Sequence, residues 1–119
     1  MAVIAKQELS GGTDGIGVKV AATASAGTTI HTANNVTGAG LYDEIYLYAT
    51  NTNTSAETLI IYFGGTTAVL NEIRHVIQPD ETVLVVPGLI LQNSLVVSAL
   101  STTADKVTIH GFVNRITAS

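Results

Sequence analysis

Residues 43–50 show the clearest pattern of hydrophobic and polar positions along the chain. Successive side chains of a β-strand point to opposite faces of a sheet, so a period of two gives a strand two different faces. This pattern predicts a strand with one apolar face in a core and one face bearing Glu and Tyr. Asp43, Ile45, Leu47 and Ala49 alternate with Glu44, Tyr46, Tyr48 and Thr50.

Similar apolar segments recur at intervals of about ten residues, separated by turn-forming residues. Val, Ile and Thr, whose branched side chains fit a pleated sheet, number 13, 11 and 17 of the 119 residues. The sequence therefore predicts an all-β fold, a single-domain antiparallel β-sandwich (jelly-roll-like) of about eight strands. The strand segments are 18–24, 28–33, 42–51, 58–65, 71–77, 81–87, 89–100 with a bend at 92–94, and 106–116.

The N-terminal segment differs from the rest of the chain. Four glycines lie between Gly11 and Gly17, a density typical of a linker. We expect residues 1–16 to be an extended, flexible N-terminal arm and residues 17–119 to form the β-sandwich domain.

The last strand raises the question of chemistry because it contains His110 and Arg115. Alternation places Val107, Ile109, Gly111 and Val113 on one face, and His110 lies on the other among Lys, Thr and Asn residues. We interpret His110 as a structural residue and place Arg115 with it on the outer face. A glycine in mid-strand indicates a bulge or a close backbone approach at Gly111.

The sequence gives little support for a metal site or for acid–base catalysis. His31, His75 and His110 lack the short spacing of a metal site, and the chain has no cysteine. The acid pairs Asp43–Glu44 and Asp80–Glu81 are interpreted as solvated structural residues, because neighbouring strand residues point to opposite faces. We predict no enzyme activity, no cofactor and no metal.

The low share of charged residues favours a protein as the binding partner. Charged residues make up only 12% of the chain, about half the usual share, which suggests that other protein covers much of the surface. A Thr/Asn/Ser surface that is polar without charge is the alternative. The five Lys and Arg residues are scattered, so nucleic acid is not an expected partner. Pro87 and Gly88 interrupt the longest apolar run, so no membrane partner is expected either.

Three strings carry a resemblance to a known family: LYDEIYLYATNTNTSAETLIIYFGG, IQPDETVLVVPGLILQNSLVVSAL and the terminal VTIHGFVNRI. Together they resemble small structural proteins of tailed bacteriophages, most closely head decoration (capsid cement) proteins. The resemblance covers residues 28–116. It implies a virion protein on the outer surface of the capsid, commonly a homotrimer, whose partner is the major capsid protein and which bridges neighbouring subunits against internal pressure.

The candidate interface residues are those whose polar or aromatic groups are expected to face away from the core. They are Glu44, Tyr46, Tyr48, Arg74, His110 and Arg115. Tyrosine is enriched at protein interfaces because it combines contact area with a polar tip. The alternative function is a carbohydrate- or receptor-binding β-sandwich of a phage tail or neck.

Overall fold

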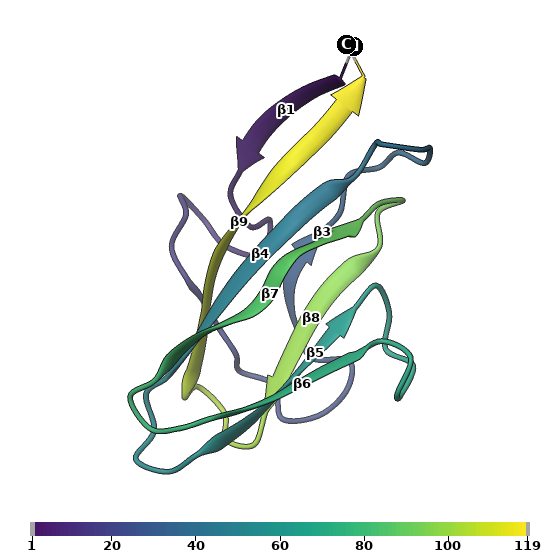
Figure 1. Ribbon diagram of the computed structural model, residues 1–119. Helices are drawn as coiled ribbons and strands as arrows, with labels where there is room; N and C mark the ends of the chain where they lie inside the picture. Colours follow the sequence, from purple (N-terminus) through teal and green to yellow (C-terminus); the bar gives the residue numbers. More distant parts are fainter. Residues whose placement is uncertain (1, 119) are drawn as a thin grey trace.

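The computed structural model describes residues 2–118 and contains nine strands in that range (Figure 1). The prediction of an all-β fold is confirmed, with one strand added at the N-terminus. The strands are β1 (Ala2–Gln7), β2 (Val18–Lys19), β3 (Thr28–Thr32), β4 (Asp43–Asn51), β5 (Glu57–Phe63), β6 (Glu72–Ile77), β7 (Thr82–Leu91), β8 (Val96–Ser101) and β9 (Val107–Ala118).

The strands form two antiparallel sheets, here called sheet A and sheet B. Sheet A has the order β1-β9-β4-β7, with β2 also paired to β9, and sheet B has the order β3-β8-β5-β6. From β2 onward most successive strands alternate between the sheets, so the eight strands β2–β9 have the arrangement of a jelly roll. The jelly-roll-like sandwich expected from the sequence is therefore the observed fold.

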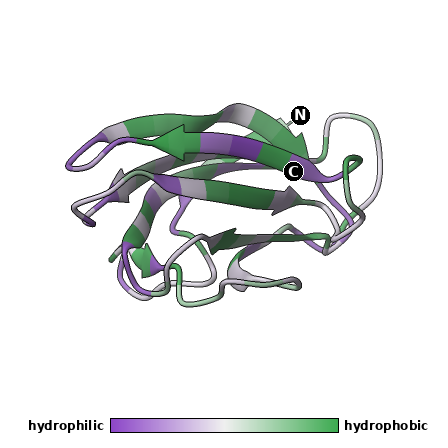
Figure 2. Cartoon of the chain, turned by 90° about the horizontal axis from the view of Figure 1, so that it is seen from below, coloured by the Kyte–Doolittle hydropathy of each residue, from purple (hydrophilic) through white to green (hydrophobic). Residues whose placement is uncertain are grey.

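The core lies between the sheets and follows the predicted alternation. Ile45, Leu47 and Ala49 of β4 are fully buried, and so are Val107 and Ile109 of β9. Figure 2 shows the two layers from below, with apolar colours mainly along the strands and polar colours in many of the turns. β4 and β9 are the inner strands of sheet A, so burial of their apolar faces holds the two layers together.

The expected flexible arm is not what the structure contains. Ala2–Gln7 form β1, which pairs with the end of β9 in continuous register from Ala2 opposite Ala118 to Gln7 opposite Val113. The physical reason is the length of β9, which spans 12 residues and extends beyond the part that β2 covers. In Figure 1, β1 and the end of β9 project as a ribbon beyond the rest of the sandwich.

The segment after β1 closes one side of the sandwich rather than forming a loose linker. Leu9 is buried in the core, and the Gly11 N–H donates to the Ile30 carbonyl oxygen at 2.9 Å. A Cβ on Gly11 would collide with backbone oxygens of β3, so only glycine permits this approach. Consequently the boundary proposed at residue 16 does not separate an arm from a domain.

Two glycines determine how the strands of sheet A meet. At Gly111 a Cβ would collide with the Tyr46 carbonyl oxygen, while the β4–β9 register runs without a shift. The close approach expected there is confirmed, and the bulge alternative is wrong. Gly88, with φ of 88°, lies next to Pro87 in β7, where the β4–β7 register shifts.

Over residues 2–118, the structure contains no helix long and apolar enough to cross a membrane.

Gly111→Ala should lower the free energy of unfolding by at least about 2 kcal/mol, because the new methyl group must displace the backbone of β4. Chemical denaturation monitored by circular dichroism measures this loss. Gly17→Ala is the matched control: the atoms nearest to its Cβ would belong to the side chains of His110 and Thr108, which can adjust more easily than backbone. We expect less than about 1 kcal/mol there; equal losses for both variants would contradict the close-approach explanation.

Candidate functional site

The candidate site is the solvent side of sheet A, here called the outer face. Residues directly opposite in an antiparallel pair share one face, so the strand register identifies its members. Tyr46 is paired with Phe112 and Tyr48 with His110, and on the other side Tyr48 is paired with Leu84. The outer face comprises Ile4, Lys6, Lys19, Glu44, Tyr46, Tyr48, Thr50, Thr82, Leu84, Pro87, Ile90, Thr108, His110, Phe112, Asn114 and Ile116.

An aromatic row crosses the outer face from β1 to β7. The rings of Tyr46 and Phe112 are stacked, with centroids 4.9 Å apart and an angle of 16° between their planes. The Lys6 ammonium group lies 4.7 Å from the centre of the Phe112 ring. A Cβ on Gly88 would lie 2.9 Å from Tyr46 Cζ, so the tyrosine ring lies against the bare backbone of β7. The row thus ties four strands together on the solvent side.

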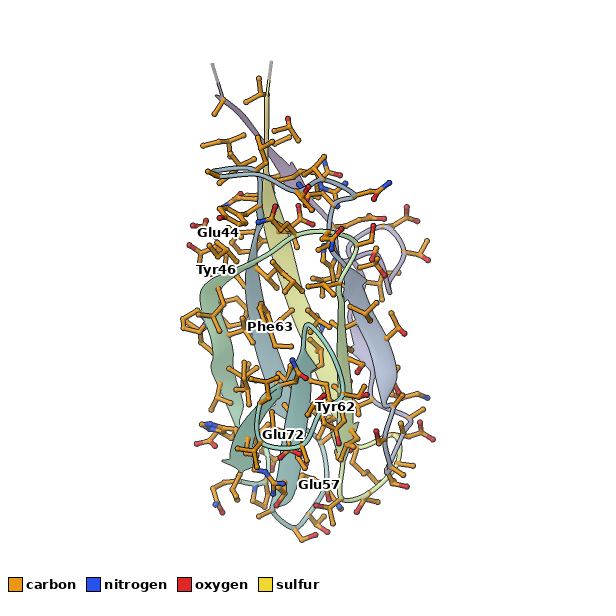
Figure 3. All side chains as sticks on the ribbon, turned by 90° about the vertical axis from the view of Figure 1, so that its right-hand side faces the viewer. Glu44, Tyr46, Glu57, Tyr62, Phe63 and Glu72 are labelled. Atoms are coloured by element: carbon orange, nitrogen blue, oxygen red, sulfur yellow. The ribbon has the colours of Figure 1, made fainter. Side chains whose placement is uncertain are left out.

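Polar contacts of Glu44 flank the aromatic row on β4 and β9. Asn114 Nδ2 donates to Glu44 Oε1 at 3.1 Å across β9 and β4. The Glu44 carboxylate raises the pKa of the Tyr46 phenol, so Tyr46 remains a neutral hydroxyl at neutral pH. Figure 3 shows Glu44 and Tyr46 side by side on the outside of the sheet, away from the core.

Much of the outer face is apolar and exposed to solvent. Ile4 is 66% exposed, Ile90 51%, Leu84 47% and Tyr48 38%. Single exposed apolar side chains are common, but several on one face that carries only three Lys, Arg, Asp or Glu residues, Lys6, Lys19 and Glu44, are typical of a surface that contacts another protein.

The structure brings four of the six predicted interface residues together. Glu44, Tyr46, Tyr48 and His110 all lie on the outer face, on the adjacent strands β4 and β9. Arg74 lies on β6 of sheet B, where its guanidinium contacts Glu72 at 2.6 Å.

The placement of Arg115 on the outer face is wrong. Arg115 shares the face of Val113, and its side chain, 31% exposed, binds the carboxylate of Asp43 on β4. Arg115 Nε donates to Asp43 Oδ1 at 2.9 Å, and Nη2 donates to Oδ2 at 3.0 Å. Such a two-bond pair is the strongest arrangement that arginine and a carboxylate form.

The interpretation of Asp43 as a solvated residue is also wrong, because its side chain is fully buried. His31 of β3, 1% exposed, contacts Asp43 Oδ2 through Nε2 at 2.8 Å. The Asn34 backbone N–H donates to the same oxygen at 3.2 Å. Asp43, His31 and Arg115, here called the buried cluster, therefore connect β4 and β9 of sheet A with β3 of sheet B.

The hydrogen bonds determine the tautomer of His31. The Ser10 backbone N–H donates to Nδ1 at 3.0 Å, so Nδ1 carries no proton and the proton is on Nε2, which donates to Asp43. Burial lowers the pKa of His31, and this outweighs the opposing effect of the Asp43 carboxylate. His31 is therefore neutral at neutral pH.

Asp43 is the charged partner in the cluster. Burial alone would raise its pKa, but hydrogen bonds from Arg115 and His31 lower it below the ordinary value. The same contact raises the pKa of Arg115. The cluster is thus a carboxylate–guanidinium pair with a neutral imidazole as an additional donor.

Ser10, His31 and Asp43 resemble a nucleophilic triad in residue type only. The Ser10 hydroxyl oxygen accepts a hydrogen bond from the Thr32 N–H at 2.7 Å, while its backbone N–H, and not its hydroxyl, donates to His31. The arrangement fastens the segment after β1 to the edge strand β3.

The three histidines lie apart in the fold, on β3, β6 and β9. Within the described range of 2–118, no group of three or more His, Cys, Asp or Glu side chains could hold a metal ion, and no pocket occurs.

The sequence analysis did not predict the buried cluster, and of the stacked rings it named only Tyr46 as a candidate. Alternation also places Phe112 on the face of His110, but its pairing with Tyr46 depends on strand order, which spacing does not reveal. Asp43 and Arg115 carried a usable signal: both occupy core-facing positions of their strands by simple alternation.

Comparisons of the chain with protein-family models, with curated proteins and with solved structures find no match.

Asp43→Ala should lower the free energy of unfolding by about 3–5 kcal/mol, because it leaves His31 and Arg115 without their partner. Urea denaturation provides the measurement. Glu44→Ala is the matched control, since Glu44 is the neighbouring acid but lies on the outer face, where its partners are Asn114 and Tyr46. A loss for Asp43→Ala no larger than for Glu44→Ala would show that the cluster contributes little.

Stability should fall as the pH drops below about 6.5. The ordinary pKa of histidine is 6.5, and the folded-state pKa of His31 is lower, so below pH 6.5 the unfolded chain binds a proton that the folded chain does not. The slope contributed by His31 is at most about 1.4 kcal/mol per pH unit. The lowered pKa of Asp43 adds a second loss below about pH 4.

Denaturation of the His31→Gln variant from pH 7 to pH 5 isolates this effect. The glutamine amide can still donate to Asp43 but does not titrate, so the stability of the variant should vary less with pH than that of the wild type. Identical slopes in the variant and the wild type would rule out His31 as the source.

Proposed function

We propose that this protein is a virion structural protein that binds the outer surface of a tailed-phage capsid and stabilises it by bridging neighbouring major capsid subunits. The observation that carries the proposal is the outer face of sheet A, which combines several exposed apolar side chains with few charges. The stacked rings of Tyr46 and Phe112 lie across its two inner strands.

The chemistry of this face suits contact with another protein. Its exposed Tyr48, Leu84 and Ile90 offer apolar area, and burial of such area drives association at roughly 25 cal/mol per Å² before the opposing costs of binding. Because the rings of the aromatic row are fixed by stacking, their ordering on binding costs little conformational entropy. A rigid sheet face of this kind can cover a wide area of a partner.

The choice of partner rests on the resemblance in residues 28–116 to phage head decoration proteins. It supports the major capsid protein as the surface that is covered, the outside of the virion as the location and a homotrimer as the oligomer. On a shell, many copies bind one particle, so modest affinity at each contact gives large total stabilisation.

The alternative function, binding of a carbohydrate or receptor by a phage tail or neck protein, has less support from the outer face. Jelly rolls include lectins, and sugars stack on free aromatic faces. Here Phe112 is covered by Lys6 on one side and Tyr46 on the other, and Tyr46 also contacts Gly88. Both rings are only partly exposed, which leaves Tyr48 as the exposed aromatic side chain on this face.

Co-sedimentation with expanded phage heads that lack the protein tests the proposal. The wild type should pellet with the heads in a saturable manner and raise the temperature at which they release DNA. Tyr48→Ser should weaken binding about tenfold or more, because buried tyrosines are frequent hot spots of interfaces.

Arg74→Ser is the matched control, because it removes an exposed polar group from sheet B on the opposite side of the sandwich. Binding that weakens equally in both variants would contradict the outer face as the contact surface. A protein that ignores the heads but binds a glycan array would support the alternative function instead.

A further inference from the structure

The two sheets differ in how their edges are protected from pairing with other strands. An open edge strand presents unpaired N–H and C=O groups to any other strand, so proteins normally block it with charges, prolines, bulges or covering segments. The edge strand β7 is interrupted by Pro87, by Gly88 in a left-handed conformation and by two register shifts against β4. It cannot present a regular ladder.

Both edges of sheet B are protected as well. The outer side of β3 is covered by the segment after β1, because Gly11 bonds the Ile30 carbonyl and the Ser10 hydroxyl bonds the Thr32 N–H. The other edge strand, β6, carries Glu72, Arg74 and His75 within four residues. Charged side chains on an edge oppose pairing.

The other edge of sheet A is formed by the two-residue strand β2 and by β1, and among the described residues β1 has no proline, no register shift and no covering segment. All six residues of β1 are exposed, and its register with β9 is continuous. Its one charged residue, Lys6, folds back over the Phe112 ring. Val3 is 45% exposed and Ile4 66% exposed, on opposite faces of the strand. Among the described residues, β9 is the only strand that pairs with β1.

We propose that β1 is a pairing edge and that its partner is β1 of a second copy of this chain. The two strands run antiparallel about a two-fold axis perpendicular to the sheet, which joins two copies of sheet A into one continuous sheet. This interaction is independent of the proposed capsid function and of the three-fold association implied by the resemblance.

The sequence of β1 is complementary to itself in this arrangement. Pairing about Ile4 places Ile4 opposite the partner's Ile4 and Val3 opposite the partner's Ala5, so both exposed apolar side chains gain cover. Residues of equal parity meet, which keeps the outer faces of the two copies on the same side. Lys6 lies opposite the partner's Ala2, so this register places no like charges opposite each other.

A two-fold contact also explains why an unprotected edge need not lead to open-ended aggregation. The contact is isologous, so each β1 edge is consumed by an identical edge and no open edge of this kind remains. A two-stranded ribbon is only marginally stable alone, and a continuous sheet would stabilise the projecting β1–β9 ribbon from its free side.

Disulfide trapping tests the proposal, because the chain contains no cysteine of its own. In the Ile4→Cys variant the two thiols face each other across the axis at a separation that a disulfide can span. Mild oxidation should give a covalent dimer at least tenfold faster than oxidation of the Ile90→Cys control. Ile90 lies on the same outer face, and its exposure is similar, but it belongs to the opposite edge strand.

Light scattering of charge variants provides the second readout. The wild type should form dimers, or hexamers where three-fold association coexists. Ile4→Lys and Ile4→Glu should each lose the two-fold contact, and an equal mixture of them should restore it; Ile90→Lys should behave as the wild type. A wild type that remains a monomer or trimer at its highest soluble concentration, or equal trapping at positions 4 and 90, overturns the proposal.

Discussion

The carboxylate of Asp43 is the group on which the sandwich depends most. A buried carboxylate is tolerated only where donors replace the water it has lost. Here the donors come from two segments distant in sequence: the Arg115 guanidinium from β9, and the His31 imidazole and the Asn34 backbone from β3 and the residues after it. Since Asp43 can be satisfied only when β4, β9 and β3 lie in their native positions, the cluster specifies the relation of the two sheets as well as stabilising it.

The cluster also explains why the N-terminal segment is ordered. His31 needs a donor for Nδ1, and the Ser10 N–H supplies it while the Ser10 hydroxyl caps the edge of β3. Leu9 is buried next to this contact, and β1, which precedes it, pairs with the free side of β9. Three of the four glycines in this segment, Gly11, Gly12 and Gly17, lie so close to other atoms that a Cβ would collide with them, so they permit close packing of the segment.

Local patterns were sufficient to predict the strands and their faces but not the contacts between them. Alternation in 43–50 correctly separated Ile45 and Leu47 from Tyr46 and Tyr48. The same rule applied strictly would have placed Arg115 with Val113 on the core side; it was overruled by the expectation that charged residues face solvent. That Arg115 lies opposite Asp43 depends on strand order and register. These arise from contacts distant in sequence, so spacing alone could not reveal them.

One face of sheet A packs in the core and the other faces solvent, and β9 contributes side chains to both. Its inner side contributes Val107, Ile109 and Val113 to the core, and its outer side supports Tyr46 through Phe112. Two copies joined at β1 would present two outer faces on the same side of one sheet, because residues of equal parity meet at the junction. Such a pair doubles the contact area without any new surface chemistry. On a partner with repeated subunits the second face binds at high effective concentration, so the open edge and the apolar face reinforce each other.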